Sequence, residues 1–387
     1  MYDRRRADAL CALGSMRLEE GRVKCGGDSK KKEADGVGTV GSRPAASVVD
    51  IFCGAGGLSH GFRQRGFEIV GGIDINEDCR YAFEQNNNAP FIRRDVATLK
   101  ADDINRLFTP GKPRILVGCA PCQPFSTYNQ KNDDPKWQLL HQFAHLVDQV
   151  RPDVLSMENV PRLLAFKEGS IFKQFVEKLH DAEYHVVWDV LYGPDFGLAQ
   201  TRSRLVLLAS KLGSIKLPCA THQGKHRTVR DEIGDLPPLI HGGVDDSDPL
   251  HRASRLSEIN ARRISSAKPG GTWRDWSPPL LAECHKVKTG KGYSSVYGRM
   301  AWDKPSPTIT TQFFGFGNGR FGHPEQDRAL SLREGALLQG FPKDYAFIAP
   351  DEHVGFKKVG RLIGNAVPVN LAAAIANAVN KHLEEVL

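Results

Sequence analysis

The sequence predicts an α/β protein, a doubly wound sheet with a smaller irregular domain inserted into it. Short apolar runs rich in β-branched residues alternate with helical patterns, which is typical of strands joined by helical crossovers. The first run, 48–52, leads into a glycine-rich turn. The alternation stops near residue 210 and returns near residue 323. The sheet domain is therefore expected to comprise 46–210 and 323–387, with the irregular domain over 211–322.

Residues 1–45 combine charged and small residues with little hydrophobic periodicity, which predicts a disordered leader. Two short basic runs lie in this segment, at residues 4–6 and 30–32. An alternative is that the true start is Met16 or later, so that part of the segment does not belong to the protein.

The ordered part begins with apolar runs short enough to be buried strands. These strands are predicted at 48–52, 68–73, 115–117, 154–157, 186–190 and 205–209, with a further strand ending before Asp95. A helix is predicted over 137–150, where five apolar residues fall near one face, and another over 371–386. Right-handed crossovers place the strand ends, and any ligand, along one edge of the sheet.

The irregular domain is rich in Pro, Gly, His, Trp and basic residues. Residues 211–300 contain 15 Lys and Arg against 9 Asp and Glu, so most of the net charge of +7 lies there. A basic stretch of this kind suits a nucleic-acid partner, although a solvated basic surface would have the same composition.

The bulk composition is that of a soluble protein, with 40% hydrophobic and 25% charged residues among 387. No uninterrupted apolar run reaches 18 residues, and the N-terminus lacks the apolar core of a secretory signal. We therefore expect a cytoplasmic protein without a membrane partner. The eight cysteines are scattered, so no disulfide framework is expected.

The glycine-rich turn after the first strand is suited to a ligand that approaches the backbone closely. Its candidate contacts are Phe52, Gly54, Gly56, Gly57 and Leu58. The Gly-x-Gly-x-x-Gly spacing of dinucleotide sites is absent, so a cofactor such as S-adenosylmethionine is favoured over a nicotinamide.

Two acidic residues follow later strands and complete the candidate cofactor site. Asp74, followed by Ile75, is placed to accept ribose hydroxyls, and Asp95, followed by Val96, to accept from an adenine amino group. Each aspartate alone is more often a turn or cap residue. Together with the glycine turn they indicate an adenosine-type cofactor, without separating a methyltransferase from a dehydrogenase.

The strand at 115–117 runs into a loop with Cys119, Pro121 and Cys122. A zinc site would need a second ligand pair, and no partner Cys-x-x-Cys exists, so no metal is expected. A thioredoxin-like redox pair would leave the glycine turn unexplained. The third interpretation is an exposed nucleophile, Cys122, with Cys119 as a small packed residue.

The next strand favours the nucleophile. It ends in Glu158, which places a carboxyl group at the same edge as Cys122. Arg202 and Arg204 precede another strand and point the same way if extended, toward a base carbonyl or a phosphate. A thiol and a carboxyl group at neighbouring strand ends suit covalent attack on a heteroaromatic ring.

Six motifs together resemble those of the DNA (cytosine-5)-methyltransferase family, of the bacterial modification type, in the family's order. They are Phe-x-Gly-x-Gly-Gly (52–57), Pro-Cys-Gln (121–123), Glu-Asn-Val (158–160), Gln-x-Arg-x-Arg (200–204), Arg-Glu-x-Ala-x-Leu-Gln-Gly-Phe-Pro (333–342) and Gly-Asn-Ala-Val-Pro (364–368). The resemblance covers roughly residues 46–385. One departure is Pro124, where many members have Gly.

The resemblance implies a Rossmann-like sheet that binds S-adenosylmethionine and a target recognition domain at 211–322. It implies methyl transfer to C5 of cytosine in a specific double-stranded DNA sequence, with the base flipped out of the helix. Cys122 would attack C6 covalently, Glu158 would hydrogen-bond the ring N3 and exocyclic amine, and Arg202 and Arg204 would face the base carbonyl and phosphates.

The resemblance also implies the remaining contacts. Phe52 would stack near the adenine, and Pro121, Asn365 and Val367 would help to enclose the cofactor. Gln123 and Ser126, on the loop of the nucleophile candidate, are candidate DNA contacts. Arg299 and Thr310 are further candidates because their stretches of the recognition region mix hydroxyl groups, Arg and Gln, although each residue alone is more often a loop or core residue. A monomer is expected, with a cognate restriction endonuclease as a functional partner. The alternatives are an RNA cytosine-5 methyltransferase of the same fold and a catalytically inactive DNA-binding homologue.

Overall fold

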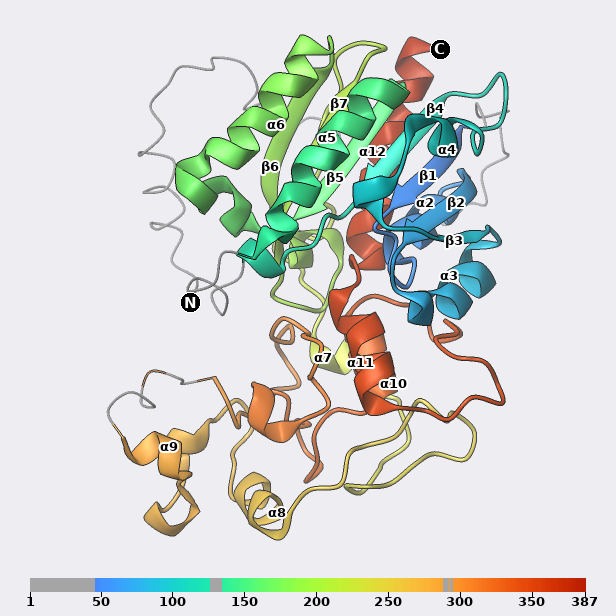
Figure 1. Cartoon of the computed structure of the whole chain (residues 1–387). Coiled ribbons are helices and arrows are strands. Elements are labelled where there is room, and N and C mark those ends of the chain that lie inside the picture. Colours follow the sequence, from blue (N-terminus) through green and yellow to red (C-terminus); the bar gives the residue numbers. More distant parts are fainter. Residues whose placement is uncertain (1–45, 126–133, 288–291, 293–294) are drawn as a thin grey trace.

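The structure is a computed structural model that describes residues 46–125, 134–287, 292 and 295–387 (Figure 1). The expected leader at 1–45 and the candidate DNA contact Ser126 lie outside these residues. The described chain forms a sheet layered between helices, with an irregular region beyond one edge of the sheet (Figure 1).

The sheet has seven strands in the order β3-β2-β1-β4-β5-β7-β6. They are β1 (Ser47–Ile51), β2 (Glu68–Asp74), β3 (Phe91–Arg93), β4 (Arg114–Gly118), β5 (Val154–Asn159), β6 (His185–Tyr192) and β7 (Ser203–Ser210). The predicted doubly wound α/β class is confirmed. One strand differs from an all-parallel sheet: β7 is antiparallel to both β5 and β6. A short connection without a crossover helix joins β6 to β7, which antiparallel pairing allows and parallel pairing does not.

Helices cover both faces of the sheet (Figure 1). The flanking helices are α2 (Gly57–Arg63), α3 (Arg80–Asn87), α4 (Ala101–Asn105), α5 (Gln138–Val150), α6 (Ser170–Asp181) and α12 (Val369–Val386). Successive strand residues point to opposite faces. Val48 therefore packs in the core beneath α2 and α12, while Val49 packs in the core beneath α5 and α6.

The irregular region contains few helices. Within 211–322, the described residues form α7 (Val229–Ile233), α8 (Glu258–Ser265) and α9 (Glu283–Lys286), and the C-terminal segment adds α10 (Leu332–Leu338) and α11 (Phe356–Asn365). A small core of its own forms around Trp273, Trp276 and Phe316. In the C-terminal segment, α12 packs on α2 of the sheet domain, whereas α10 packs on α7 and α11.

Short 3-10 helices punctuate the loops. They are η1 (Glu77–Cys79), η2 (Val96–Thr98), η3 (Gln123–Phe125), η5 (Pro135–Trp137), η6 (Pro161–Gly169), η7 (Gly193–Phe196), η8 (Trp273–Asp275), η9 (Pro278–Leu280) and η11 (Phe316–Asn318).

One helical stretch of the described chain, Phe356–Val386, is long and apolar enough to cross a membrane, and 72% of its apolar window is buried inside the protein. It consists of α11 and α12, separated at Pro368. This stretch does not appear as an uninterrupted apolar run in the sequence, because polar residues interrupt its apolar residues. Its burial is that of a core helix.

Candidate active site at the carboxyl edge of the sheet

The candidate catalytic residues come from three adjacent strands. β4 and β5 are parallel, so the loop after β4, which contains Cys122, starts beside the end of β5, which contains Glu158. β7 is antiparallel to β5, with Glu158 opposite Val206. The amino end of β7, with Arg202 just before it and Arg204 within it, therefore lies at this same edge. A parallel β7 would have placed both arginines at the opposite edge.

The Glu158 carboxylate is held at both oxygens. Its side chain is 2% exposed, and Arg204 Nε lies 2.7 Å from Oε1 as an ion pair rather than a well-directed hydrogen bond. The thiol of Cys119 donates to Oε2 over 2.9 Å. Cys119 packs against the core, as expected for a small packed residue, and this contact adds a polar role to that interpretation. The C-x-x-C spacing alone could not indicate it, because the carboxylate comes from another strand.

Cys122 is half-buried beside this carboxylate. Burial raises the pKa of its thiol; Arg204 and Arg202 oppose that rise, and Glu158 adds to it. A thiol must have a lowered pKa to react readily as a thiolate. In the protein as described, burial outweighs the two guanidinium groups. In this state, the thiol form of Cys122 is favoured.

Arg202 lies deeper than the sequence suggested. Its side chain is buried, and Nη1 donates to the carbonyl of Ile309 over 3.1 Å. Burial, reinforced by Arg204, lowers the pKa of its guanidinium to about 9. Its Nε has no hydrogen-bond partner among the described residues. Arg202 thus links the sheet to the irregular region, next to the exposed Thr310.

Two buried glutamines connect the motifs, and the sequence analysis did not single them out. Gln200 Nε2 donates to Gln339 Oε1 over 2.8 Å, and Gln200 Oε1 accepts from the Ile309 amide over 2.9 Å. Gln339 Nε2 donates in turn to the carbonyl of Ala366 over 2.7 Å. The available signal was that both are amide residues inside motifs, where burial requires each polar atom to be paired.

Asn159 fixes the start of the Cys122 loop. Its Nδ2 donates to the carbonyl of Ala120 over 3.1 Å, and its Oδ1 accepts from the amide of Val160 over 2.8 Å. Within the loop, Pro121 is half-buried and Gln123 is exposed. The loop is thereby tied to the end of β5 immediately before the nucleophile candidate.

The glycine turn leaves an open space above its backbone. A Cβ at Gly54 (φ 52°) would meet no described heavy atom within 4 Å, whereas one at Gly56 would lie 2.3 Å from Asn87. A Cβ at Gly57 would lie 2.4 Å from the carbonyl oxygen of Val367. The turn and the C-terminal Gly-Asn-Ala-Val-Pro motif are therefore in contact, while the space at Gly54 is open for a ligand.

The side chains of the other candidate cofactor residues differ in how far they are exposed. Phe52 (φ 63°) is half-buried against Phe143, and Leu58 is buried. Asn365 is exposed at the end of α11. Val367 is 5% exposed, and its backbone carbonyl oxygen rather than its side chain approaches the glycine turn.

Asp74 accepts two backbone amides, from Gly54 over 3.0 Å and from Asn76 over 2.9 Å. Burial raises the pKa of its carboxyl group. Next to it, Ile75 is 60% exposed, an apolar surface beside a polar acceptor. An open glycine turn, a carboxylate that accepts hydrogen bonds and an exposed apolar side chain are compatible with an adenosine-type cofactor.

Asp95 is exposed, and its Oδ1 caps η2 by accepting from the Ala97 amide over 2.9 Å. Val96 was expected to contact the cofactor. It is 3% exposed and packs in the core beneath α5, so its side chain does not line the open space. The physical reason is that η2 turns the chain inward directly after its capping aspartate.

A buried carboxyl group lies beneath the turn and was also missed. Asp50 is fully buried in β1, and Ser59 Oγ donates to its Oδ2 over 2.6 Å. Burial raises the pKa of Asp50 to about 7. An Asp within an apolar run was a visible signal, because a buried strand disfavours an ionised side chain.

Arg299 was expected to contact DNA, and the structure contradicts this. It is 3% exposed, and it donates to the carbonyls of Ile264, His323 and Gln326 and to Asp327 Oδ1. The sequence could not separate it from a base-reading residue, because an arginine in a stretch with Ser and Tyr hydroxyl groups has the composition of such a surface. Gln123 and Thr310 are exposed and stay available as DNA contacts.

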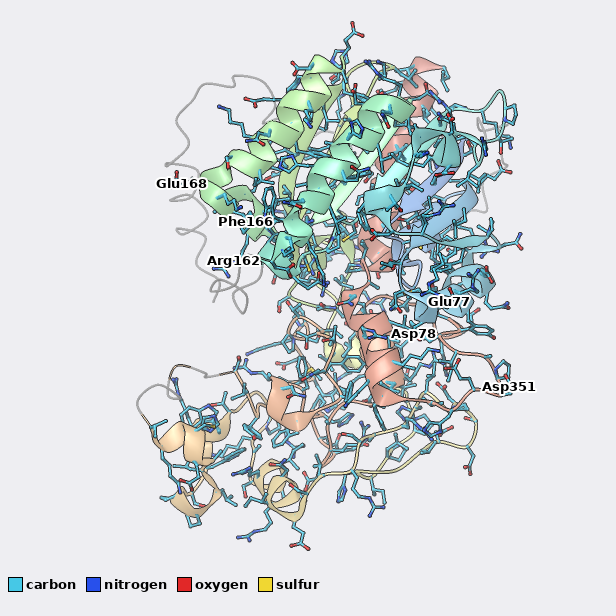
Figure 2. All side chains as sticks on the ribbon, viewed as in Figure 1. Glu77, Asp78, Arg162, Phe166, Glu168 and Asp351 are labelled. Carbon is cyan, nitrogen blue, oxygen red and sulfur yellow. The ribbon has the colours of Figure 1, made fainter. Side chains whose placement is uncertain are left out.

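Figure 2 shows residues on either side of this edge. Arg162 and Phe166 belong to η6, and Glu77 and Asp78 belong to η1 next to Asp74. Asp78 pairs with Arg361, which ties α11 to the cofactor side of the edge. Within the described residues, no group of three His, Cys, Asp or Glu is placed to hold a metal ion.

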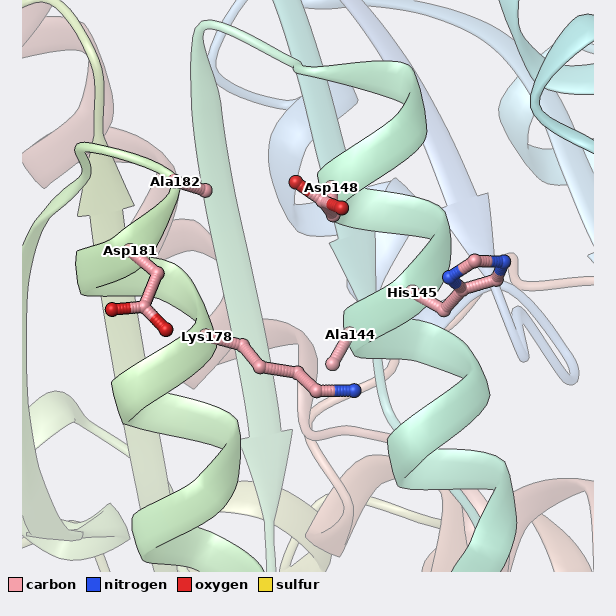
Figure 3. Close-up of a pocket in the computed structure, with 6 residues that line it drawn as sticks. All are labelled: Ala144, His145, Asp148, Lys178, Asp181 and Ala182. Atoms are coloured by element: carbon pink, nitrogen blue, oxygen red, sulfur yellow. The ribbon is translucent and has the colours of Figure 1, made fainter.

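A cavity of about 180 Å³ lies between α5 and α6 (Figure 3). Its lining includes His145 and Asp148 of α5 and Lys178 and Asp181 of α6. These residues lie near the carboxyl ends of the two helices, which lead to the starts of β5 and β6. The cavity is therefore at the sheet edge opposite Cys122 and does not belong to the candidate site.

Comparisons with known proteins identify similar sequences and a matching family. The model of the family described as C-5 cytosine-specific DNA methylase matches residues 46–381. The chain is 51% identical over 340 residues to the Type II methylase M.HgiDII of Herpetosiphon aurantiacus, covering 87% of this chain and 96% of the relative. It is 33% identical to the Type II methyltransferase M1.HphI of Haemophilus parahaemolyticus, covering 87% of each.

Among solved structures, the fold resembles a prophage-encoded protein of E. coli described as a DNA modification methyltransferase. The TM-score is 0.67 with 22% identity, covering 88% of this chain and 99% of the other. This likeness concerns the fold.

Proposed function

The chain belongs to the family of C-5 cytosine-specific DNA methylases and is a DNA (cytosine-5)-methyltransferase; from this premise, we propose that it transfers a methyl group from S-adenosylmethionine to C5 of a cytosine flipped out of a specific double-stranded DNA sequence. The observation that carries the proposal is the gathering of Cys122, Glu158 and Arg204 at one edge of the sheet, beside the open glycine turn.

Cys122 supplies the nucleophile. Cytosine C5 is a weak nucleophile, and addition of the Cys122 thiolate to C6 converts the C5–C6 double bond into an enamine that can take up a methyl group. The thiol must first lose its proton, and its pKa is raised by burial in the free protein. Arg204 and Arg202 lower that pKa, so they favour the thiolate electrostatically once the base is in place.

Glu158 faces the part of the ring that gains electron density. As sulfur adds to C6 and N3 takes up a proton, the Glu158 carboxylate accepts hydrogen bonds from N3 and from the exocyclic amine, which stabilises the developing charge. Arg204, 2.7 Å from Oε1, orients the carboxylate and faces the base carbonyl. After transfer, a solvent water takes up the C5 proton, the C6–S bond breaks to return the Cys122 thiolate, and N3 gives up its proton, which restores the aromatic ring.

The turn around Gly54 holds the cofactor. S-adenosylmethionine, when bound, supplies an electrophilic methyl group on a positively charged sulfur. Asp74 is placed to accept from the ribose hydroxyls, Ile75 and Phe52 offer apolar surface to the adenine, and Asn365 lies at the end of α11 beside the pocket. Asp95 is the candidate acceptor for the adenine amino group.

We further propose that the enzyme acts as a monomer on DNA, and that a cognate restriction endonuclease is its functional partner. The relatives named as type II methylases support the second proposal. The basic composition of residues 211–300 supports a nucleic-acid substrate.

Bisulfite sequencing of DNA from a methylation-deficient host expressing the protein tests the proposal. We expect protected cytosines within one short sequence context, and none in a host expressing Cys122→Ser. In vitro, the purified enzyme should label duplex DNA but not transfer RNA with a radioactive methyl group. Label in RNA alone would overturn DNA as the substrate. Full activity of Cys122→Ser would overturn the covalent mechanism.

A further inference from the structure

Glu158 sits between an ion-pair partner and a hydrogen-bond donor that come from different elements. Arg204 of β7 contacts Oε1 over 2.7 Å, and the thiol of Cys119, the residue directly after β4, donates to Oε2 over 2.9 Å. Two contacts at separate oxygens determine the rotation of the carboxylate about its last bond. One contact alone would leave that rotation free, because the terminal torsion of Glu has a broad energy well.

We propose that Cys119 is a positioning residue for methyl transfer: its thiol holds the Glu158 carboxylate in the orientation that meets the flipped cytosine. This inference rests on the proposed function, and it assigns to the first cysteine of the Cys-x-x-Cys loop a task separate from that of Cys122. Cys119 itself does not contact the base.

The chemistry of the pair supports a lasting donor role. Burial and the Glu158 charge raise the pKa of the Cys119 thiol well above its usual range, so the S–H proton is retained. A carboxylate oxygen accepts such a proton readily, and hydrogen bonds to an ionised acceptor are stronger than neutral ones. Cys119 is half-buried, so few waters can replace the thiol if it is removed.

The position of Cys119 follows from the fold. β4 ends at Gly118, opposite Met157 of β5, so the next residue along each strand, Cys119 and Glu158, lies at the same level. The following residue of β5, Asn159, binds the carbonyl of Ala120 over 3.1 Å and prevents the two segments from separating. The thiol and carboxylate are thus held together by adjacent backbone contacts.

The test compares Cys119→Ala, which removes the donor, with Cys119→Ser, which keeps one. We expect the single-turnover rate of methyl transfer in Cys119→Ala to fall about 10-fold, the size that accompanies loss of one hydrogen bond to a charged group. The dissociation constants for DNA and S-adenosylmethionine should stay within about twofold, because Cys119 contacts neither. Cys119→Ser should recover the rate to within about threefold.

A matched control is Cys79→Ala, which removes another buried cysteine, in η1, and should leave the rate unchanged. If Cys119→Ala does not fold, Cys119→Val offers a similar volume without a donor and takes its place. Equal rates in wild type and either donor-free variant would overturn the inference, as would equally slow Ser and Ala variants. The proposed function would still stand in both cases, because it depends on wild type being active and Cys122→Ser being inactive.

Discussion

Arg204 and Glu158 form an ion pair across two antiparallel strands, with side chains only 12% and 2% exposed. The pair crosses from β7 to β5 at the edge where the nucleophile candidate lies. A charge this deeply buried costs several kcal/mol unless its partner stays in place. The pair therefore couples stability to the geometry of the site.

Replacing Arg204 with Ala should lower the free energy of unfolding by about 3 kcal/mol, because it leaves the Glu158 charge buried and unpaired. Adding Glu158→Gln to this variant should recover part of the loss, which urea unfolding of the single and double variants would measure. The exposed pair Lys173–Glu177 is the control, and Lys173→Ala should cost about 0.5 kcal/mol or less. If the stability changes of Arg204→Ala and Glu158→Gln simply added in the double variant, the two side chains would not be coupled.

Replacing Gln339 with Ala should destabilise the protein by about 2 kcal/mol, since it leaves Gln200 Nε2 and the carbonyl of Ala366 with one partner fewer. Because Ala366 adjoins Val367 beneath the glycine turn, affinity for S-adenosylmethionine should fall as well. Calorimetric titration and denaturant unfolding would measure both. Gln138 is exposed, so Gln138→Ala is the control and should change neither stability nor affinity. If Gln339→Ala also changed neither, the hydrogen bonds from Gln200 through Gln339 to Ala366 would be dispensable.

Asp50 should make stability depend on pH. Its carboxyl ionises near pH 4 in the unfolded chain but only at about pH 7 in the folded protein. Between these values the unfolded state releases the proton first, so stability falls as pH rises and levels off above about pH 7. Full ionisation costs of order 4 kcal/mol.

Asp50→Asn removes this cost while keeping an acceptor for Ser59. Its stability relative to wild type should therefore increase from pH 4.5 to pH 7 and stay constant above, as followed by urea unfolding at several pH values. Parallel pH curves for the two proteins would show that Asp50 does not titrate in this range.

Gly54 and Gly57 should respond differently to Ala. A Cβ at Gly54 enters open space, so Gly54→Ala should mainly weaken binding of S-adenosylmethionine, by about 10-fold or more, at a stability cost of about 1 kcal/mol for its left-handed backbone. Gly57→Ala must displace the carbonyl of Val367 and should cost more stability, about 2 kcal/mol or more. Calorimetry and thermal unfolding separate the two effects, and the reverse ranking would argue against a cofactor above Gly54.

Arg299→Ala should destabilise the irregular region by about 2–3 kcal/mol, because it leaves three carbonyls without their donor. The sequence context methylated by the residual activity should not change, since Arg299 is buried. The exposed Arg262→Ala removes the same charge and should not alter stability. If Arg299→Ala, but not Arg262→Ala, methylated a broader set of DNA sequences, Arg299 would again be a candidate for base recognition.

Much of the architecture could be predicted from the sequence. The features that could not be predicted have one cause in common. Strand positions follow from local apolar runs, and the predicted helix over 137–150 agrees with α5 to within a residue. The direction of β7 is not local information, and neither is the burial of Arg299. Polar residues in a loop look alike in sequence whether they face solvent or the carbonyls of a distant segment.

By itself the sequence determined the α/β class, the glycine turn after β1 and the candidates Cys122 and Glu158 at two strand ends, since these depend on periodicity and on the order of motifs along the chain. Only the tertiary structure decided which side chains meet: Arg204 and Cys119 on the Glu158 carboxylate, Gln200 on Gln339, and the glycine turn on Val367. Those contacts join residues far apart in the chain, and their partners are selected by strand direction and burial, which no local pattern encodes.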